Sequence, residues 1–134
     1  MRILIIDDEV RRMQATVDML RSDHHIVDQI TNPSQALQKL RSAPKQYDLI
    51  ILDVMMPIDN ENEFKVLDTD YGLRTGVLLL NKIKEIYTFT APIVVLTANY
   101  EIEEELKGKV NHFLRKPVPY AQLKAAIDKL HTKS

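Results

Sequence analysis

The chain lacks cysteine, a long hydrophobic run and any leader ahead of its first apolar segment. Without cysteine there is no disulfide, no thiolate nucleophile and no cysteine-ligated metal site, which fits a reducing compartment. No apolar run approaches the roughly 20 residues that a membrane-spanning helix needs. Met1 and Arg2 lead directly into an apolar run, which leaves no room for a signal peptide. We therefore expect a cytoplasmic protein.

The chain also lacks a strong net charge. Its 134 residues carry a formal net charge of -1, with 45% apolar and 28% charged residues and neither repeats nor low-complexity stretches. No global basic field draws such a protein to nucleic acid or to anionic lipid, so we expect no direct binding to nucleic acid or to a membrane. The length predicts a single domain over residues 1–134, which buries roughly two thirds of its unfolded surface.

Four short apolar runs each end on a reactive polar residue. The runs are 3–6, 49–52, 93–96 and 113–115, and they are followed respectively by Asp7 with Asp8, by Asp53, by Thr97 and by Lys116. Near-continuous apolar runs of strand length, separated by helical patterns, predict parallel strands buried on both faces. Ligands bind at the carboxyl ends of such strands. Three carboxylates, a hydroxyl and an ammonium should therefore converge on one edge of the sheet.

Helical patterns separate these strands. Apolar residues recur at helical spacing over about 9–21, 33–43, 76–87, 101–107 and 119–131, whereas 24–30 indicates a weaker edge strand. Asn32 is a good N-cap for the second of these helices, with Pro33 at its first position. The alternation of strands and helices predicts an α/β fold. We expect one doubly wound, five-stranded parallel sheet with helices on both faces and right-handed crossovers.

The segment 58–75 does not fit a minimal α/β unit. It is rich in acidic residues, and a connection of this length in a compact domain is normally either functional or disordered. Apolar residues such as Phe64 and Tyr71 give it side chains to bury, so we expect a partly ordered flap. A solvated loop without a role is the alternative.

The three strand-end carboxylates suit a divalent cation. Mg²⁺ prefers a few carboxylates together with waters and phosphate oxygens, and Mn²⁺ is a second candidate. Without a cation the carboxylates repel one another, and one or more of their pKa values should rise. Asp7 and Asp8 could instead only cap the helix that follows them. Asp53 is harder to explain in this way, because no helix start follows it closely.

The same edge is suited to a phosphoryl group. A carboxylate can attack phosphorus and form an aspartyl phosphate, while a metal neutralises the incoming charge. The ammonium of Lys116 would hold one phosphoryl oxygen and the hydroxyl of Thr97 another, with the small Ala98 leaving room. The alternatives are a surface lysine before a proline and an ordinary β-branched strand residue.

Five short motifs in this order resemble the receiver domain of two-component response regulators. They are Asp7-Asp8, Asp53, Met56-Pro57, Thr97-Ala98 and Lys116-Pro117. The resemblance implies that Asp53 accepts a phosphoryl group from a histidine kinase or a histidine phosphotransfer protein. It also implies that Asp8, Asp53 and the backbone carbonyl of Met55 bind Mg²⁺ directly, that Asp7 helps through water, and that Lys116 contacts the phosphoryl group.

The resemblance further implies a switch. Thr97 would move towards the phosphoryl group and the ring of Phe113 would turn inward, unless Phe113 is only an apolar residue of the last strand. A downstream protein target or a homodimer would then bind the surface of the fourth helix, last strand and last helix. The apolar candidates on that surface, most of which could equally be core, are Tyr100, Ile102, Leu106, Val118 and Tyr120. Because the chain ends soon after its last helix, we expect a stand-alone receiver.

Two features of this chain modify the family pattern. The connection from Pro57 to Gly76, the counterpart of a family glycine, is about fifteen residues longer than usual. The resemblance also implies that Met55 and Asn99 flank the water that hydrolyses the phosphoaspartate. Because a methionine side chain cannot orient water by hydrogen bonding, we expect slow self-dephosphorylation.

Other functions share parts of this pattern. A Mg²⁺-dependent aspartyl-phosphate phosphatase of the haloacid dehalogenase type needs a second Asp where Met55 stands. An FMN carrier with a flavodoxin-like fold, which is the fold expected here, needs hydroxyls and amides where the acidic Asp7-Asp8-Glu9 would repel a phosphate. A phosphorylation-independent scaffold normally lacks a reactive residue, and none is missing. We expect a phosphoacceptor signalling domain, not an enzyme, whose own reactions are self-phosphorylation from small donors and self-dephosphorylation.

Overall fold

A single parallel sheet forms the centre of the molecule. The structure is a computed structural model that describes residues 1–7, 10–53, 75–86, 91–97, 110, 112–116 and 118–132. Its strands are β1 (Arg2–Ile6), β2 (Ile26–Ile30), β3 (Leu49–Asp53), β4 (Ile93–Thr97) and β5 (His112–Arg115). All pairings are parallel, and the order across the sheet is β2-β1-β3-β4-β5. The chain therefore winds first outward to β2 and then back past β1 towards β5.

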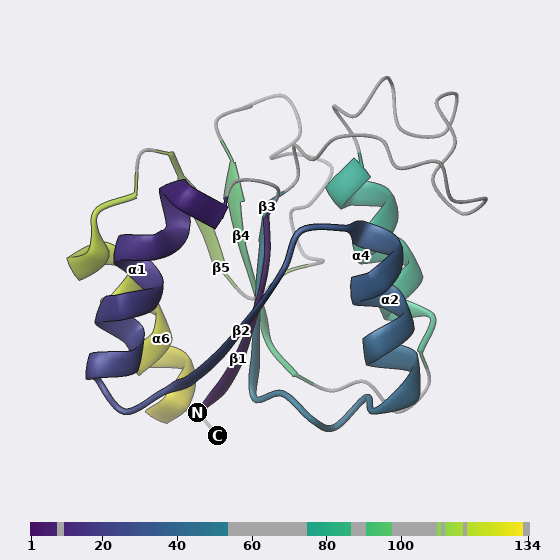
Figure 1. Ribbon diagram of the computed structural model, residues 1–134, viewed down its shortest axis with the longest axis horizontal. Helices are drawn as coiled ribbons and strands as arrows, with labels where there is room; N and C mark the ends of the chain where they lie inside the picture. Colours follow the sequence, from purple (N-terminus) through teal and green to yellow (C-terminus); the bar gives the residue numbers. More distant parts are fainter. Residues whose placement is uncertain are drawn as a thin grey trace.

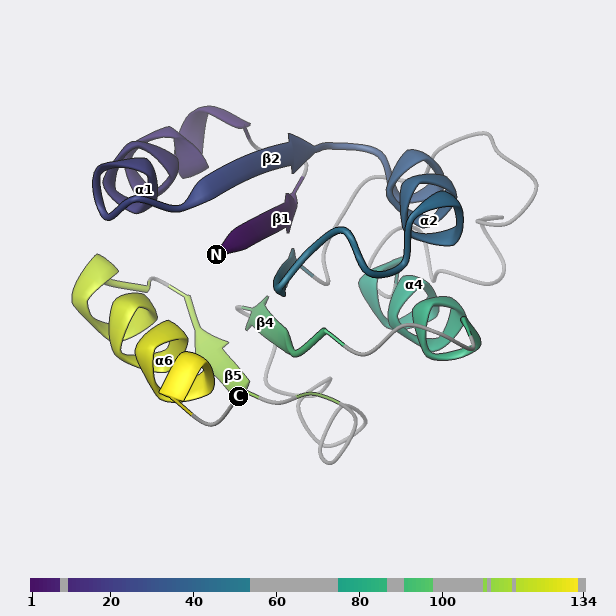
Figure 2. The same cartoon turned by 90° about the horizontal axis from the view of Figure 1, so that it is seen from below.

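Helices cover both faces of this sheet. In Figure 1, α1 (Val10–Ser22) and α6 (Tyr120–Thr132) lie on one side of the sheet, and α2 (Pro33–Ser42) and α4 (Thr75–Lys84) lie on the other. Figure 2, seen from below, shows the same two pairs flanking the strands. The expected doubly wound, five-stranded α/β fold is therefore confirmed. Among the described residues, no helix has the length and apolar character needed to cross a membrane.

Two hydrophobic clusters, one on each face, explain why the strand sequences are almost continuously apolar. In β1, Leu4 and Ile6 belong to the cluster beneath α2 and α4, whereas Ile3 and Ile5 belong to the cluster beneath α1 and α6. All four side chains are at most 1% exposed. Burial of each contributes roughly 1.5–3 kcal/mol relative to an exposed position. Alternate residues face opposite helical layers, so the positions of β1 after the exposed Arg2 are all apolar.

The expected element boundaries agree closely with the structure. The helices expected over 9–21, 76–87 and 119–131 correspond to α1, α4 and α6, and the weak strand expected over 24–30 is the edge strand β2. Thr75, which the sequence places at the end of the long loop, is instead the first residue of α4. The rest of that loop and the helix expected over 101–107 lie outside the described residues.

The start of α2 follows the sequence signal closely. Asn32 has extended backbone dihedral angles, and its side-chain oxygen accepts a hydrogen bond of 3.0 Å from the backbone N–H of Gln35. Pro33 occupies the first turn, where its missing N–H leaves no helical bond unmade. The cap therefore determines where the chain turns from β2 into the helix.

The end of α1 has an unusual backbone conformation. His24 has a φ of 70°, and it is the one non-glycine residue with positive φ among the described residues. Its N–H donates to the carbonyl of Arg21, and the N–H of His25 donates to the carbonyl of Leu20, both at 3.1 Å. This pair of bonds is a Schellman motif, in which the left-handed position is normally glycine. A β-carbon there is unfavourable by about 1–2 kcal/mol.

Replacing His24 by glycine should therefore stabilise the protein. We expect His24→Gly to raise the free energy of unfolding by about 0.5–1 kcal/mol, because the relief of strain exceeds the extra entropy of the unfolded chain. Urea denaturation followed by circular dichroism measures the change. His24→Ala, which keeps the β-carbon, should give no such gain. A His24→Gly protein that unfolds at or below the wild-type midpoint would contradict the explanation.

Candidate functional site

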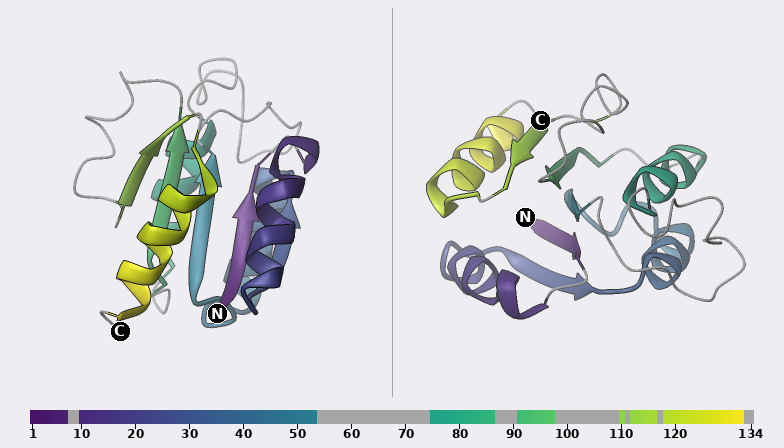
Figure 3. Two further views of the ribbon diagram at one scale, coloured as in Figure 1. Left: turned by 90° about the vertical axis from the view of Figure 1, so that its left-hand side faces the viewer. Right: turned by 90° about the horizontal axis from the view of Figure 1, so that it is seen from above.

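The carboxyl ends of the strands meet at one edge of the sheet. The register pairs Ile6 with Leu52, Asp53 with Leu96 and Thr97 with Arg115, so successive strands end at nearly the same level. The left view in Figure 3 shows the strands side by side, pointing towards the same edge. The backbones of Asp53 and Thr97 therefore lie on neighbouring strands at this edge.

Asp7 is the first residue beyond β1 and lies at the same edge. It is 6% exposed and is the one buried charged residue among the described positions. Its backbone N–H donates to the carbonyl of Ile30 at 3.1 Å, which extends the pairing of β1 with β2 by one residue. The carboxylate is thus carried on backbone that is paired with β2. Burial of a charged carboxylate is unfavourable unless a nearby positive charge or hydrogen-bond donor compensates for it.

Lys116 supplies part of that compensation. Its Nζ lies 3.9 Å from Oδ2 of Asp7, and its side chain is 34% exposed. Because β3 and β4 lie between β1 and β5, the backbones of the two residues are separated by three strand spacings, or about 14 Å. The lysine therefore extends across the carboxyl ends of β3 and β4. The ion pair therefore lies across the end of β3, the strand whose last residue is Asp53.

The donor chemistry of this edge suits a hard divalent cation. Asp7 places a buried carboxylate beside the end of β3, whose last residue is Asp53. Nζ of Lys116 lies 3.9 Å from this carboxylate, which is longer than the 2.7–2.9 Å or so of a charge-assisted hydrogen bond. Oxygen ligands of this kind are those that Mg²⁺ and Mn²⁺ accept.

Several residues expected at the site lie outside the part of the chain that the structure describes. These are Asp8, Met55, Met56, Pro57, Ala98, Asn99 and Pro117, together with the side chains of Asp53 and Thr97. Their roles stay predictions from the resemblance. What the structure brings together is the Asp7 carboxylate, the Lys116 ammonium and the backbone ends of β3 and β4.

Phe113 lies in β5, which β4 separates from the strand that ends with Asp53. Its side chain is partly buried and packs against the cluster beneath α2 and α4, while Leu114 belongs to the opposite cluster. The ring therefore has partners on the α4 side of the sheet. This position agrees with a core role, and the proposed switch role stays a prediction.

Two of the five apolar candidates for an output surface are described, and both contribute to the core. Val118 and Tyr120 pack against the cluster beneath α1 and α6. The Tyr120 hydroxyl also donates a hydrogen bond of 2.5 Å to Asp23, whose carboxylate lies 3.7 Å from Nζ of Lys124. These contacts join the start of α6 to the turn after α1. Tyr100, Ile102 and Leu106 lie outside the described residues.

This contact perturbs both titrating groups. The hydrogen bond from Tyr120 lowers the pKa of the Asp23 carboxyl, and the positive charge of Lys124 acts in the same direction. Burial, together with the hydrogen bond to Asp23, raises the pKa of Tyr120 to about 12. The sequence carries no signal for this pair, because 97 positions separate its members.

The chain belongs to the response regulator receiver domain family, and the sequence model of this family matches residues 3–128. Response regulator RppA of Synechocystis sp. is 30% identical over 137 residues, which cover 100% of this chain and 52% of RppA. Transcriptional regulatory protein ResD of Bacillus subtilis is 31% identical over 107 residues, covering 80% of this chain and 37% of ResD. The chain thus spans about half or less of the length of these relatives.

Solved structures show the same architecture. A two-component response regulator from Clostridium difficile is 25% identical with a TM-score of 0.75, covering 98% of this chain and 96% of that one. Response regulator TrrA from Thermotoga maritima, in complex with Mg²⁺-BeF, is 27% identical with a TM-score of 0.73, covering 96% of this chain and 97% of that one. The fold is flavodoxin-like, and the chain is a receiver domain of two-component systems, a signalling domain and not a conventional enzyme.

The contact between Tyr120 and Asp23 predicts a bell-shaped dependence of stability on pH. A carboxyl with a lowered pKa contributes stability above its ordinary value of 3.8, and the contribution is lost as pH falls through the folded-state pKa. A phenol with a raised pKa contributes fully below its ordinary 10.0 and loses the contribution as pH rises through about 12.

The Tyr120→Phe variant should therefore be less stable than wild type at neutral pH, and the difference should shrink as pH falls below 3.8 and as it rises above 10.0. Urea midpoints measured from pH 3 to pH 11 check this, and Asp23→Asn should abolish the acid-side change. A constant stability difference across the whole range would show that the hydroxyl acts through packing alone.

Proposed function

We propose that the chain is a phosphoacceptor receiver domain, extending over residues 1–134, in which Asp53 accepts a phosphoryl group in a Mg²⁺-dependent reaction. The donor is a histidine kinase or a histidine phosphotransfer protein. The observation that supports this most directly is the ion pair between Lys116 and Asp7, 3.9 Å long, which crosses the end of the strand that carries Asp53. It brings an ammonium and a buried carboxylate together at the edge of the sheet where β3 ends.

The reaction is a transfer from nitrogen to oxygen. A carboxylate oxygen of Asp53 attacks the phosphorus of a donor phosphohistidine, a P–O bond forms and the P–N bond breaks, and the imidazole leaves with a proton. Asp8, Asp53 and the Met55 carbonyl would hold the Mg²⁺ ion directly and Asp7 through water. When bound, the ion neutralises charge on the phosphoryl oxygens and the carboxylates.

Lys116 and Thr97 are proposed to bind the phosphoryl group itself. The Lys116 side chain already extends across the ends of β3 and β4, so its ammonium is proposed to bind an oxygen of the phosphoryl group on Asp53. Thr97 is the last residue of β4, next to β3, where its hydroxyl can bind a second oxygen. Charges and donors that are in place before the reaction reduce the reorganisation needed during it.

The output is proposed to follow from the change in charge. Phosphorylation replaces a carboxylate of charge about −1 by a group of nearly −2 and adds acceptor oxygens. Thr97 would be drawn to those oxygens, and Phe113, which packs on the α4 side of β5, would follow it inward. The altered surface of the segment before β5, of β5 and of α6 would bind a downstream protein or a second copy of the chain. The cytoplasmic location and the role of segment 58–75 stay predictions.

Phosphorylation from a small donor tests the acceptor. Incubation with acetyl phosphate and Mg²⁺ should add the mass of one phosphoryl group, as seen by intact-protein mass spectrometry, and chelation of the metal should prevent it. Asp53→Asn should abolish the added mass, and Lys116→Ala should slow its appearance at least about tenfold, because a charge that stabilises the transition state is lost. The control is Asp18→Asn, which removes an exposed carboxylate of α1 and should react at the wild-type rate. Persistence of the added mass in Asp53→Asn would assign the acceptor elsewhere.

The lifetime of the phosphorylated state tests the role of residue 55. Met55→Asn or Met55→Glu should lose the phosphoryl group roughly tenfold faster than wild type, because a polar side chain can orient the attacking water. Hydrolysis is followed by mass spectrometry after the donor has been removed. Met55→Leu, which is equally unable to bind water, should keep the slow wild-type rate. If the polar variants hydrolyse no faster than wild type, the methionine does not set the lifetime.

A further inference from the structure

The backbone of Asp7 depends on the edge strand of the sheet. In a parallel sheet, alternate residues direct their N–H and C=O groups to opposite sides. Arg2 directs its carbonyl towards β3, where it accepts from the N–H of Asp48, whereas Met1 directs its carbonyl to the N–H of Ile26 in β2. Asp7 follows the pattern of Met1, and its N–H donates to Ile30. The position of Asp7 is therefore set by β2, which has a neighbouring strand on one side only.

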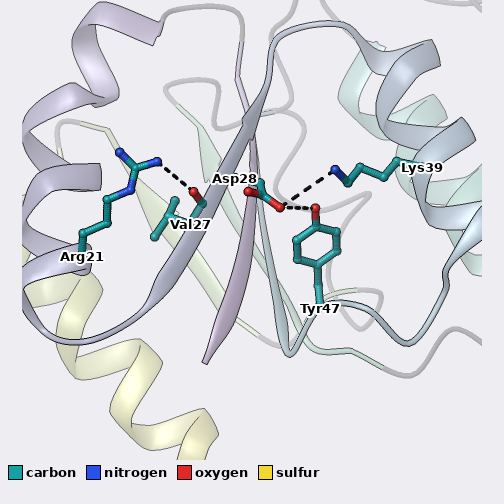
Figure 4. Close-up of polar contacts among 5 residues, drawn as sticks. All are labelled: Arg21, Val27, Asp28, Lys39 and Tyr47. Atoms are coloured by element: carbon teal, nitrogen blue, oxygen red, sulfur yellow. Dashed lines mark hydrogen bonds and ion pairs between the residues drawn. The ribbon is translucent and has the colours of Figure 1, made fainter.

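Side chains from the α2 side fasten β2. The hydroxyl of Tyr47 donates a hydrogen bond of 2.6 Å to Oδ2 of Asp28, and Nζ of Lys39 lies 4.0 Å from the same oxygen (Figure 4). Tyr47 itself is 4% exposed, and the cationic groups of Arg2 and Lys39 each lie 5.9 Å from the centre of its ring. Burial and the Asp28 acceptor raise the pKa of Tyr47, so its hydroxyl stays a donor at physiological pH. A rigid aromatic residue thus ties the middle of β2 to the start of β3.

A second contact fastens β2 from the α1 side. Nη2 of Arg21 donates a hydrogen bond of 2.9 Å to the carbonyl of Val27, and Figure 4 shows this contact opposite that of Asp28. Because Ile26 and Ile30 direct their backbone groups towards β1, the carbonyl of Val27 is directed away from it, to the outer edge. The arginine therefore satisfies a carbonyl that no strand pairs. A charged side chain at this place also discourages pairing with another chain.

We propose that Tyr47, Asp28 and Arg21 are positioning residues for the metal site. They hold β2 in place from both sides, and β2 holds the Asp7 backbone through the carbonyl of Ile30. This inference rests on the proposed Mg²⁺-dependent function of the site. Mg²⁺ demands near-ideal octahedral geometry, and a functional group is effective only within about 0.5 Å of its proper place. An edge strand that is free to open would spread the positions of Asp7 over more than that.

The chain contains a matched control for this idea. Tyr120 donates to Asp23 just as Tyr47 donates to Asp28, and each bond joins a helix or loop to a neighbouring element. The contact of Tyr120 ends in the turn before β2, at the amino end of the strand and away from Ile30. Loss of either hydroxyl removes one tyrosine–aspartate hydrogen bond. Only the loss at Tyr47 should be transmitted to Asp7.

The test compares Tyr47→Phe with Tyr120→Phe in two measurements. Isothermal titration with MgCl₂ should show Mg²⁺ affinity weakened roughly threefold or more in Tyr47→Phe, somewhat less than for a direct partner of a metal ligand. Hydrogen exchange measured by NMR should show faster exchange of the Asp7 amide in the same variant. Tyr120→Phe should change neither quantity, although it lowers stability. If Tyr47→Phe folds poorly, Arg21→Gln can replace it, because this change is at an exposed side chain. Arg21→Gln should also weaken Mg²⁺ affinity and speed exchange of the Asp7 amide.

The outcomes separate the two levels of the proposal. Mg²⁺ affinity and Asp7 exchange that are unchanged in Tyr47→Phe and Arg21→Gln would overturn the positioning role while leaving the function intact. Equal losses in Tyr47→Phe and Tyr120→Phe would also overturn it, because the effect would then be one of general stability. A wild-type protein that ignores millimolar Mg²⁺ would overturn the proposed function, and the positioning of a metal ligand with it.

Discussion

The parallel sheet, buried on both faces, is the constraint on which the site depends. Leu4 and Ile6 on one side of β1, and Ile3 and Ile5 on the other, are inaccessible to water, so a helix must return the chain across one face after each strand. Every strand then ends at the same edge. Polar side chains are excluded from the doubly buried positions of β1, β3 and β4 and lie mainly at the ends of these strands and in the edge strands. The chemistry of the receiver domain is therefore concentrated where the hydrophobic requirement ends.

At this edge, the arrangement of side chains depends on electrostatic interactions more than on hydrophobic burial. Asp7 is the one buried charged residue in the described part of the chain, and its carboxylate is stabilised by an ammonium that extends from β5 across two strands. The buried carboxylate needs a compensating charge, whereas the lysine keeps a third of its side chain exposed to solvent. Under the proposed function, an arriving phosphoryl group would enter a site in which this ion pair is already formed. The edge strand β2 contributes no charge to this site but positions Asp7, since the backbone N–H of Asp7 pairs with it.

Much of this arrangement could be predicted from the sequence, for local reasons. The apolar run before Asp7 predicts a doubly buried strand, and Asn32 with Pro33 predicts the start of α2, because the signals lie within a few residues of the structures they encode. The alternation of elements predicts a doubly wound parallel sheet, whereas the order β2-β1-β3-β4-β5 comes from the structure. The contact between Tyr47 and Asp28 could not be predicted, because 19 positions separate the two residues and neither belongs to a recognisable motif. The core positions of Val118 and Tyr120 were likewise ambiguous.

The sequence by itself determined which residues end the strands, because hydrophobic periodicity is a local property that burial enforces residue by residue. It therefore determined the parallel sheet and the chemical character of its reactive edge. Only the tertiary structure decided that Lys116 extends across β3 and β4 to Asp7 and that Tyr47 and Arg21 fasten β2 from opposite sides. Those contacts depend on side-chain reach and on the packing of helices against the sheet. Both are set by the folded chain as a whole, and no local pattern records them.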